Sequence, residues 1–181
     1  GGSGRSVRRN SSHRHQSGVY RKTTLKNGLR VLTERVPGVR SISLGAWINV
    51  GSRCEAATEN GLSHFLEHLV FKGTRHRNAL QIAESLETLG GSLNAFTSRE
   101  HTCFTARILD EHLPQAVDVV ADLVCHPTLT QVNVDRERQV VCEEIKESLD
   151  DPSDHIHDLF AETHWSDHPL GRPVMGTQTI I

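Results

Sequence analysis

The sequence has no long apolar run and little net charge. No stretch of about eighteen apolar residues occurs, so no membrane-spanning helix is predicted. The formal net charge is −2, which gives the chain no excess of positive charge to attract a polyanion, and nucleic-acid binding is therefore disfavoured. With 181 residues, the chain has the length of one ordinary domain and can bury a hydrophobic core.

Cysteine is scarce and scattered. The four cysteines lie far apart and form no Cys-x-x-Cys pair; they are Cys54, Cys103, Cys125 and Cys142. This spacing argues against a zinc ribbon or a disulfide framework, and it is typical of a protein from a reducing compartment.

The first eighteen residues nearly lack apolar side chains, and Val7 is the clearest exception. Such a segment cannot offset its ordering entropy by burial, so residues 1–18 are predicted to be disordered. They fit a cloning remnant or a clipped chain. A mitochondrial transit peptide shares their arginine and serine content but needs an apolar helix face. Residues 19–181 are then the folded domain, expected to continue past the apolar end Ile180-Ile181.

Strands and helices alternate after Tyr20. Asn27-Gly28 lies between two alternating stretches, a strong hairpin signal. A strand pair is expected over residues 92–109, turning at residues 98–100. Residues 41–53 predict a buried strand with Ile42, Leu44, Ala46, Ile48 and Val50 on its inward face. Helices are expected over residues 61–72, 78–91, 113–127, 133–150 and 152–165. The predicted class is α+β, with a mostly antiparallel sheet covered by helices.

The second of these helices has its own boundary signals. Asn78 is a candidate N-cap, and Gly90-Gly91 should end the helix. Its inward face is expected to carry apolar residues at helical spacing, namely Leu80, Ala83, Leu86 and Leu89.

The stretch "HFLEH" places two imidazoles and a carboxylate within five residues. On a helix, His64 and His68 are four residues apart and share one face, so both can reach one metal ion. Glu67 borders that face and is placed to hold a water molecule. This is the inverted order of the His-Glu-x-x-His zinc helix, and it serves the same chemistry.

Histidine pairs four residues apart also arise by chance in a chain with twelve histidines, and His164 and His168 are such a pair. That second pair runs into Pro169 in a polar stretch, where solvated side chains cost little. By contrast, His64 and His68 lie in an apolar run, where buried polar groups are costly unless they are paired or bind a ligand.

Catalytic zinc usually has three protein ligands and one open position, so a third ligand is sought elsewhere. Candidates lie in the 133–150 helix, at Glu137, Glu143, Glu144 and Glu147. Glu137 and Glu144 are two turns apart and should share a face with Val140 and Val141. Glu143 is turned away and should meet water. An ordinary helix with surface acids is the alternative interpretation.

These motifs, in this order, resemble the inverted-zincin metallopeptidases of the pitrilysin or insulinase-like group (M16). The metal helix "ENGLSHFLEHLVFKGT", the strand pair "LGGSLNAFTSREHTCFTARIL" and the segment "VDRERQVVCEEIKES" all match it. The similarity runs from about Tyr20 to the end of the chain. The nearest subgroup is the bacterial processing-protease type, similar to the catalytic subunit of mitochondrial processing peptidase.

The resemblance implies a role for each matching residue. His64, His68 and Glu144 would bind one Zn²⁺ ion per chain, and Glu67 would be the general base. Glu137 would support the metal ligands from behind, which orients them and tunes their basicity.

The strand after Gly91 is also implicated by the resemblance. Asn94 and Ala95 would contact the backbone of a peptide substrate, which fits the addition of a peptide to an exposed sheet edge. The strand must also exist for the core, whatever its role in binding.

The resemblance further implies a zinc metalloendopeptidase built as a clamshell of two related halves, acting on unfolded or presequence-like peptides. This chain corresponds to the metal-bearing half, and the second half would lie in the same chain or in a partner subunit, as a dimer. The cytoplasm of a bacterium or the mitochondrial matrix is the expected location. A non-catalytic core subunit of the same fold, an inactive isolated half-domain and a small DNA-binding or regulatory domain are the alternatives.

Overall fold

The computed structural model describes residues 14–15 and 18–181. Its contacts divide the chain into two units, residues 1–40 and residues 41–181, and each is described by itself. The disorder predicted for residues 1–18 falls mostly outside the described residues. Within that segment, β1 (Arg14–His15) pairs antiparallel with the start of β2 (Gly18–Thr24).

The first unit contains the predicted hairpin. β2 pairs antiparallel with β3 (Arg30–Glu34). The turn closes with a hydrogen bond from the Leu25 amide to the Leu29 carbonyl, 2.8 Å long. Gly28 has φ +92°, a conformation that glycine adopts without steric cost, so the Asn-Gly signal corresponds to a real turn.

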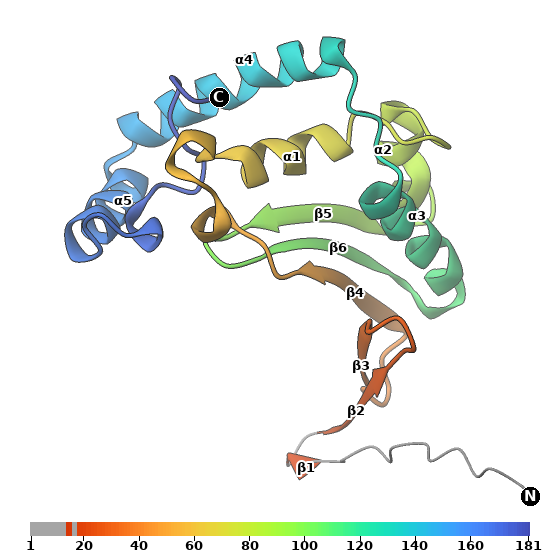
Figure 1. The fold of residues 1–181 in the computed structure, drawn as a ribbon. Coiled ribbons are helices and arrows are strands. Elements are labelled where there is room, and N and C mark those ends of the chain that lie inside the picture. The colour runs from red at the N-terminus through yellow and green to blue at the C-terminus, as the bar shows by residue number, and fades with distance from the viewer. Residues whose placement is uncertain (1–13, 16–17) are drawn as a thin grey trace, which may run out of the picture. The chain divides into compact units, whose positions relative to one another are not determined.

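The second unit is built on a three-stranded antiparallel sheet in the order β4-β6-β5 (Figure 1). The strands are β4 (Ser41–Ile48), β5 (Ser92–Thr97) and β6 (Thr102–Leu109). The expected inward face of β4 does pack on the core, except at Val50. That residue is 48% exposed because the strand ends at Ile48.

Two helices join the sheet in the main core: α2 (Ala79–Glu87) and α3 (Leu113–Cys125). Asn78 caps α2 as predicted, with a reciprocal bond to Gln81. The prediction of which face of α2 points inward is only partly correct. Ile82 and Leu86 are buried, whereas Leu80 is 65% exposed and Ala83 is also exposed. The side of the helix that carries residues 82 and 86 faces α3 and the sheet. The spacing of the apolar residues alone does not specify which side of the helix faces these neighbours.

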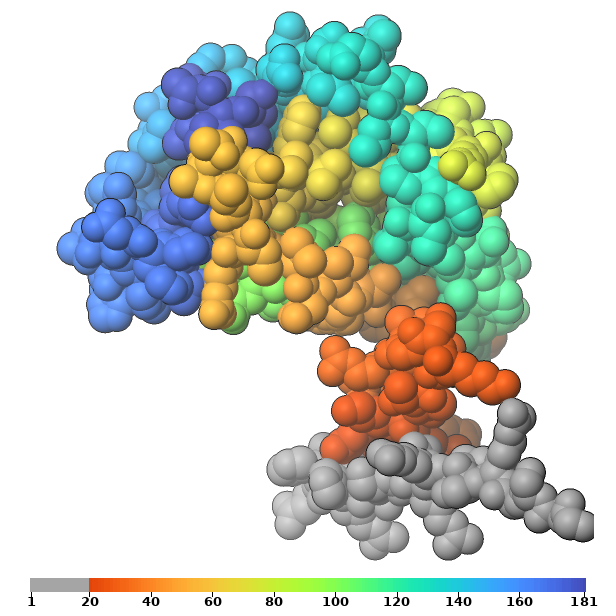
Figure 2. Space-filling model, in the orientation of Figure 1, coloured from red at the N-terminus to blue at the C-terminus, as the bar shows by residue number. Residues whose placement is uncertain are grey.

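The helix α1 (Leu62–Val70) is the middle layer of this unit. Val70 joins the core over the sheet, while Phe65 and Leu69 pack with Val141 and Ile145 of α4 (Gln131–Asp150). Figure 1 shows α1 between the sheet and α4, and Figure 2 shows it in yellow, set back from the surrounding surface. The surroundings of the polar side chains of α1 therefore depend on the residues that α4 and β5 place next to them.

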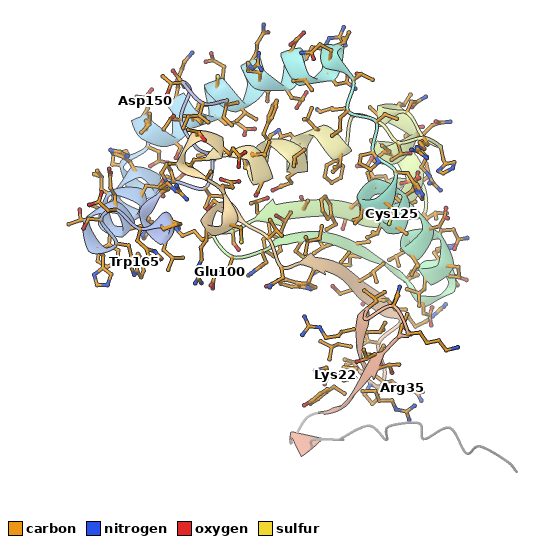
Figure 3. The ribbon with its side chains drawn as sticks, in the orientation of Figure 1. Lys22, Arg35, Glu100, Cys125, Asp150 and Trp165 are labelled. Carbon is orange, nitrogen blue, oxygen red and sulfur yellow. The ribbon has the colours of Figure 1, made fainter. Side chains whose placement is uncertain are left out.

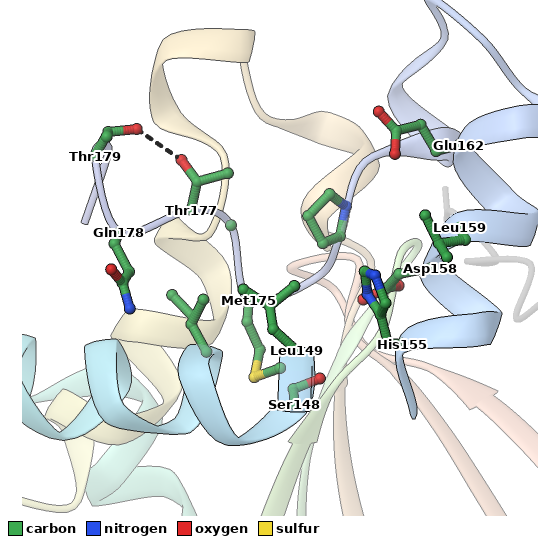
Figure 4. A pocket seen from close by; sticks show the side chains of 13 residues that line it. Ser148, Leu149, His155, Asp158, Leu159, Glu162, Met175, Thr177, Gln178 and Thr179 are labelled. Carbon is green, nitrogen blue, oxygen red and sulfur yellow. Dashed lines mark hydrogen bonds between the residues drawn. The ribbon is translucent and has the colours of Figure 1, made fainter. Parts of the chain in front are cut away.

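The chain ends with α5 (Pro152–His164) and an irregular segment. Asp151 caps α5 by accepting a hydrogen bond from the Ser153 amide, 2.8 Å long. A cavity of about 290 Å³ lies between α4, α5 and residues 173–179, with Leu149, Leu159 and Met175 among its lining residues (Figure 4). Short 3₁₀ helices are Ser52–Cys54, Ala57–Glu59, Asp110–His112 and Pro169–Gly171.

Helices of the described residues do not combine the length and the hydropathy that crossing a lipid bilayer requires.

Candidate metal centre

The N-terminus of α1 is capped by the carboxylate of Glu55, a partly buried residue that precedes the helix. Glu55 accepts hydrogen bonds from the backbone amides of Gly61, at 2.8 Å, and Ser63, at 2.6 Å. These amides belong to the first turn, where they have no partner within the helix, and a negative charge there is favourable. Gly61 has φ +102°, and a Cβ atom on it would lie 2.5 Å from the Met175 carbonyl. No local pattern in the sequence predicts this role for Glu55.

The two histidines of α1 lie on one side of the helix, as their spacing predicts. Their ring centroids are 4.7 Å apart, and both side chains are largely buried, at 15% and 20% exposure. Burial, together with a smaller effect of the neighbouring His68, lowers the pKa of His64 to about 4 against an opposing effect of Glu55. His64 is therefore neutral at neutral pH, which is the form that ligates a metal.

The third member comes from α4, which crosses over α1. The Oε2 atom of Glu144 lies 3.3 Å from His68 Nε2 and 3.9 Å from His64 Nε2. One ligand atom from each of the three residues lies within 4.8 Å of the others. Two imidazoles and one carboxylate form a donor set that suits zinc, and three such ligands leave one coordination position open.

Glu137 lies behind this trio, on the same face of α4 as Glu144. It is 6% exposed, and its Oε2 atom is 3.5 Å from His68 Nδ1 while its Oε1 atom is 3.0 Å from Lys72 Nζ. A carboxylate beside the far nitrogen of a ligating imidazole fixes the orientation of the ring. The expected companion Val141 is fully buried, but Val140 is 44% exposed, so that part of the predicted stripe is wrong. The contact face of α4 is centred on residues 137, 141 and 145.

Glu67 points toward the sheet. Its Oε2 atom accepts a hydrogen bond of 2.5 Å from the Thr97 hydroxyl. Thr97 ends β5 and lies on its half-buried face, with Leu93 and Ala95. The alternation of that strand is a signal that could have identified Thr97, but the sequence interpretation did not include it.

A pocket of about 320 Å³ opens between α1 and β5. Its lining residues are Glu67, His68, Phe71, Lys72, Leu93, Asn94 and Ala95. β5 is an edge strand that pairs only with β6 within its three-stranded sheet. The Ala95 amide donates a hydrogen bond of 2.9 Å to the Oδ1 atom of Asn94. The pocket thus contains a carboxylate, a candidate metal ligand and strand backbone, which together can hold a peptide beside an ion.

Other acids and histidines named from the sequence lie elsewhere. Glu143 is exposed and pairs with Lys146 at 2.5 Å. His164 is the last residue of α5, whereas His168 precedes the next 3₁₀ turn, with Asp167 at φ +58° between them. The second histidine pair therefore does not share one helix.

The arrangement defines a class: an α+β domain with an inverted histidine–glutamate helix and a distant carboxylate at one candidate metal site. Comparison with known proteins gives the family. Residues 30–178 match the family model described as Insulinase (Peptidase family M16). This chain belongs to the M16 peptidase family.

Individual relatives agree with this assignment. An uncharacterized zinc protease of Streptomyces coelicolor is 51% identical over 163 residues, covering 90% of this chain and 36% of the relative. One of Bacillus subtilis is 47% identical, covering 90% and 40%. The crystal structure of a protease from Helicobacter pylori superposes with a TM-score of 0.84 at 29% identity, covering 89% and 39%. The chain thus spans well under half of the length of these relatives.

Proposed function

We propose that this chain is the zinc-bearing half of a metalloendopeptidase. The observation that carries the proposal is the convergence of His64, His68 and Glu144 at one point, beside a pocket that also contains Glu67. The name "zinc protease" of the relatives from Streptomyces and Bacillus supports it.

His64, His68 and Glu144 would hold the ion, one per chain at this site. When bound, zinc polarises a carbonyl oxygen and makes water a nucleophile at neutral pH. Glu67 would take a proton from the attacking water as the new C–O bond forms, and would then give it to the leaving nitrogen as the peptide C–N bond breaks. Thr97 holds the carboxylate of Glu67 toward the pocket during both transfers.

The substrate is proposed to be an extended peptide lying along β5. Asn94 and Ala95 would contact its backbone, because the free edge of an antiparallel sheet can accept one more strand. Unfolded or presequence-like peptides meet this requirement. A second half-domain, in the same chain or in a partner subunit, would close over the peptide, consistent with the greater length of the relatives.

Metal content provides the test at this site. The chain is stripped with a chelator, incubated with zinc chloride, desalted and measured by mass spectrometry, alone and as His64→Ala. We expect the variant to bind one zinc ion fewer than the wild type, and peptide hydrolysis with the second half present to require zinc. Equal zinc content in both proteins would refute the metal site. Zinc binding without any hydrolysis would favour the non-catalytic subunit.

A further inference from the structure

A second group of metal-ligating side chains lies at the far end of α3. His76 comes from the connection between α1 and α2, while Asp122 and His126 lie one turn apart where α3 ends. Cys125, labelled in Figure 3, marks this end of the helix. One ligand atom from each of the three residues lies within 4.8 Å of the others. The proposed peptidase chemistry does not use any of them.

Asp122 is buried, at 4% exposure, and one of its oxygens is fully engaged. Oδ2 accepts hydrogen bonds from the Thr74 hydroxyl and from Arg77 Nη1, each 2.6 Å long. Burial by itself would raise the pKa of Asp122, but hydrogen bonds from His76, Thr74 and Arg77 together hold it well below the usual range. The carboxylate is therefore an anion whose orientation is fixed and whose Oδ1 atom is directed at the imidazoles.

The two imidazoles are arranged around that oxygen. Oδ1 lies 2.6 Å from His76 Nδ1 and 3.4 Å from His126 Nδ1, and the ring centroids are 5.3 Å apart. Among the described residues, His126 Nδ1 is a buried atom that makes no hydrogen bond. Buried polar atoms usually have a partner, because leaving one unsatisfied costs free energy. A bound ion is one partner that would satisfy it.

Backbone contacts hold the two histidines near each other without help from an ion. The Arg75 amide donates to the His126 carbonyl at 3.0 Å, and the Thr128 amide donates to the Gly73 carbonyl at 2.9 Å. Thr74 also forms an isolated β-bridge with Pro127. His76 and His126 thus lie on two segments that are joined in register, which is the preorganisation a metal site needs.

The charge of the cluster also suits a cation. Arg77 pairs with both Asp118 and Asp122, so two carboxylates meet one guanidinium. Two imidazoles and one carboxylate are ligands that zinc prefers, at about 2.0–2.2 Å. The Thr74 and Arg77 bonds to Oδ2 correspond to the outer partners that orient a ligating carboxylate.

We propose that His76, Asp122 and His126 bind a second divalent ion of the zinc type, which ties the loop after α1 to the end of α3. Ligand atoms around tetrahedral zinc lie about 3.3 Å apart, so His76 must move back from Asp122 by less than about 1 Å. Its side chain is 63% exposed, which leaves it room to do so. The competing interpretation is a His76 that hydrogen-bonds to Asp122 without any metal.

The experiment removes the first cluster so that only the second is counted. The double variant His64→Gln/His68→Gln is stripped with a chelator, incubated with zinc chloride, desalted and measured by mass spectrometry. We expect about one zinc ion per chain, and none when His76→Gln/His126→Gln is added. The matched control adds His164→Gln/His168→Gln instead, which removes the same number of histidines, and it should keep the ion.

Zinc should also raise the unfolding temperature of the His64→Gln/His68→Gln variant, because a ligand that binds only the folded state stabilises it. Circular dichroism establishes that each variant is folded, and His76→Gln alone serves if the combined variant is not. A His64→Gln/His68→Gln variant that binds no zinc and shows no change in unfolding temperature would overturn the proposal. This outcome leaves the peptidase site untouched, because that site is measured separately through His64→Ala.

Discussion

Two clusters of this protein contain the same ligand types, two histidines and one carboxylate, yet they differ in what surrounds them. In the first, Glu144 is 37% exposed and a pocket lies alongside, with Glu67 on its wall. In the second, Asp122 is 4% exposed, and Arg77 and Thr74 engage one of its oxygens. Beside the first cluster lies a further carboxylate, that of Glu67, which we propose transfers protons. The second has its carboxylate committed to holding two segments together.

The difference teaches that a donor set alone does not define a catalytic site. Catalysis needs an open coordination position, a base within reach and room for a substrate. The α1–α4 cluster adjoins a pocket lined by the proposed base Glu67 and by an edge strand, whereas the α3 cluster is proposed to have a structural role. The predictions below test this contrast.

The largest effect is expected at Glu67. Glu67→Gln removes the proposed general base, so kcat should fall by about 10³-fold, within the range that general acid–base catalysis contributes. Zinc content should be unchanged, because the amide leaves the ligands in place. Peptide hydrolysis with the second half present and metal analysis measure the two quantities. Glu143→Gln, an exposed acid on α4, is the control and should hydrolyse normally. If Glu67→Gln had the kcat of the wild type, Glu67 would not be the general base.

The next largest effect concerns Glu144. In a His76→Gln/His126→Gln background, Glu144→Gln should weaken zinc binding by more than about 100-fold, since losing only an outer partner of a ligand costs 10–100-fold. Competition with a chromophoric chelator measures the affinity. Glu143→Gln, one residue earlier, is the matched control. Unaltered affinity in Glu144→Gln would mean that the carboxylate is not a ligand.

Asp122 provides the corresponding test of the second cluster. Asp122→Asn leaves Arg77 with a weakened partner, and the free energy of unfolding of the metal-free chain should fall by about 3 kcal/mol, as for other broken buried pairs. Urea denaturation followed by circular dichroism measures it. Asp118→Asn also removes a partner of Arg77, but Asp118 is 70% exposed, so its loss should cost less than about 1 kcal/mol. Equal effects of the two substitutions would contradict the structural role of Asp122.

The smallest effect is expected at Thr97, which acts through Glu67. Thr97→Val removes the hydroxyl that bonds Glu67 Oε2, so kcat should fall about 10-fold, close to the effect of one lost hydrogen bond. KM and zinc content should stay near their wild-type values. Thr97→Ser restores the hydroxyl and should recover most of the rate. A loss that serine does not rescue would indicate a packing defect instead.

Much of the fold follows from local sequence signals. Asn27-Gly28 gave the hairpin turn, and Asn78 gave the start of α2, because both act through neighbouring backbone groups. The predictions that were wrong concern which helix faces are buried by tertiary contacts. Leu80 and Val140 fit their helical stripes but are exposed, since the buried face of a helix depends on which neighbour covers it.

The candidate site likewise contains features that local sequence predicts and features that depend on tertiary contacts. The spacing of His64 and His68 required only a helix, and it placed both rings on one face. Glu55 had no comparable signal, and the alternation of β5 indicated only the face on which Thr97 lies, because each of the two residues contacts α1 from a separate element.

The sequence by itself determined the hairpin, the helical pairing of two imidazoles and the family motifs, all of which depend on residues close together in the chain. Only the tertiary structure decided that Glu144 approaches His68 across two helices, that Glu67 faces β5, and that His76 meets His126. Those distances are set by how helices pack on one another and on the sheet, and packing depends on side chains far apart in the sequence.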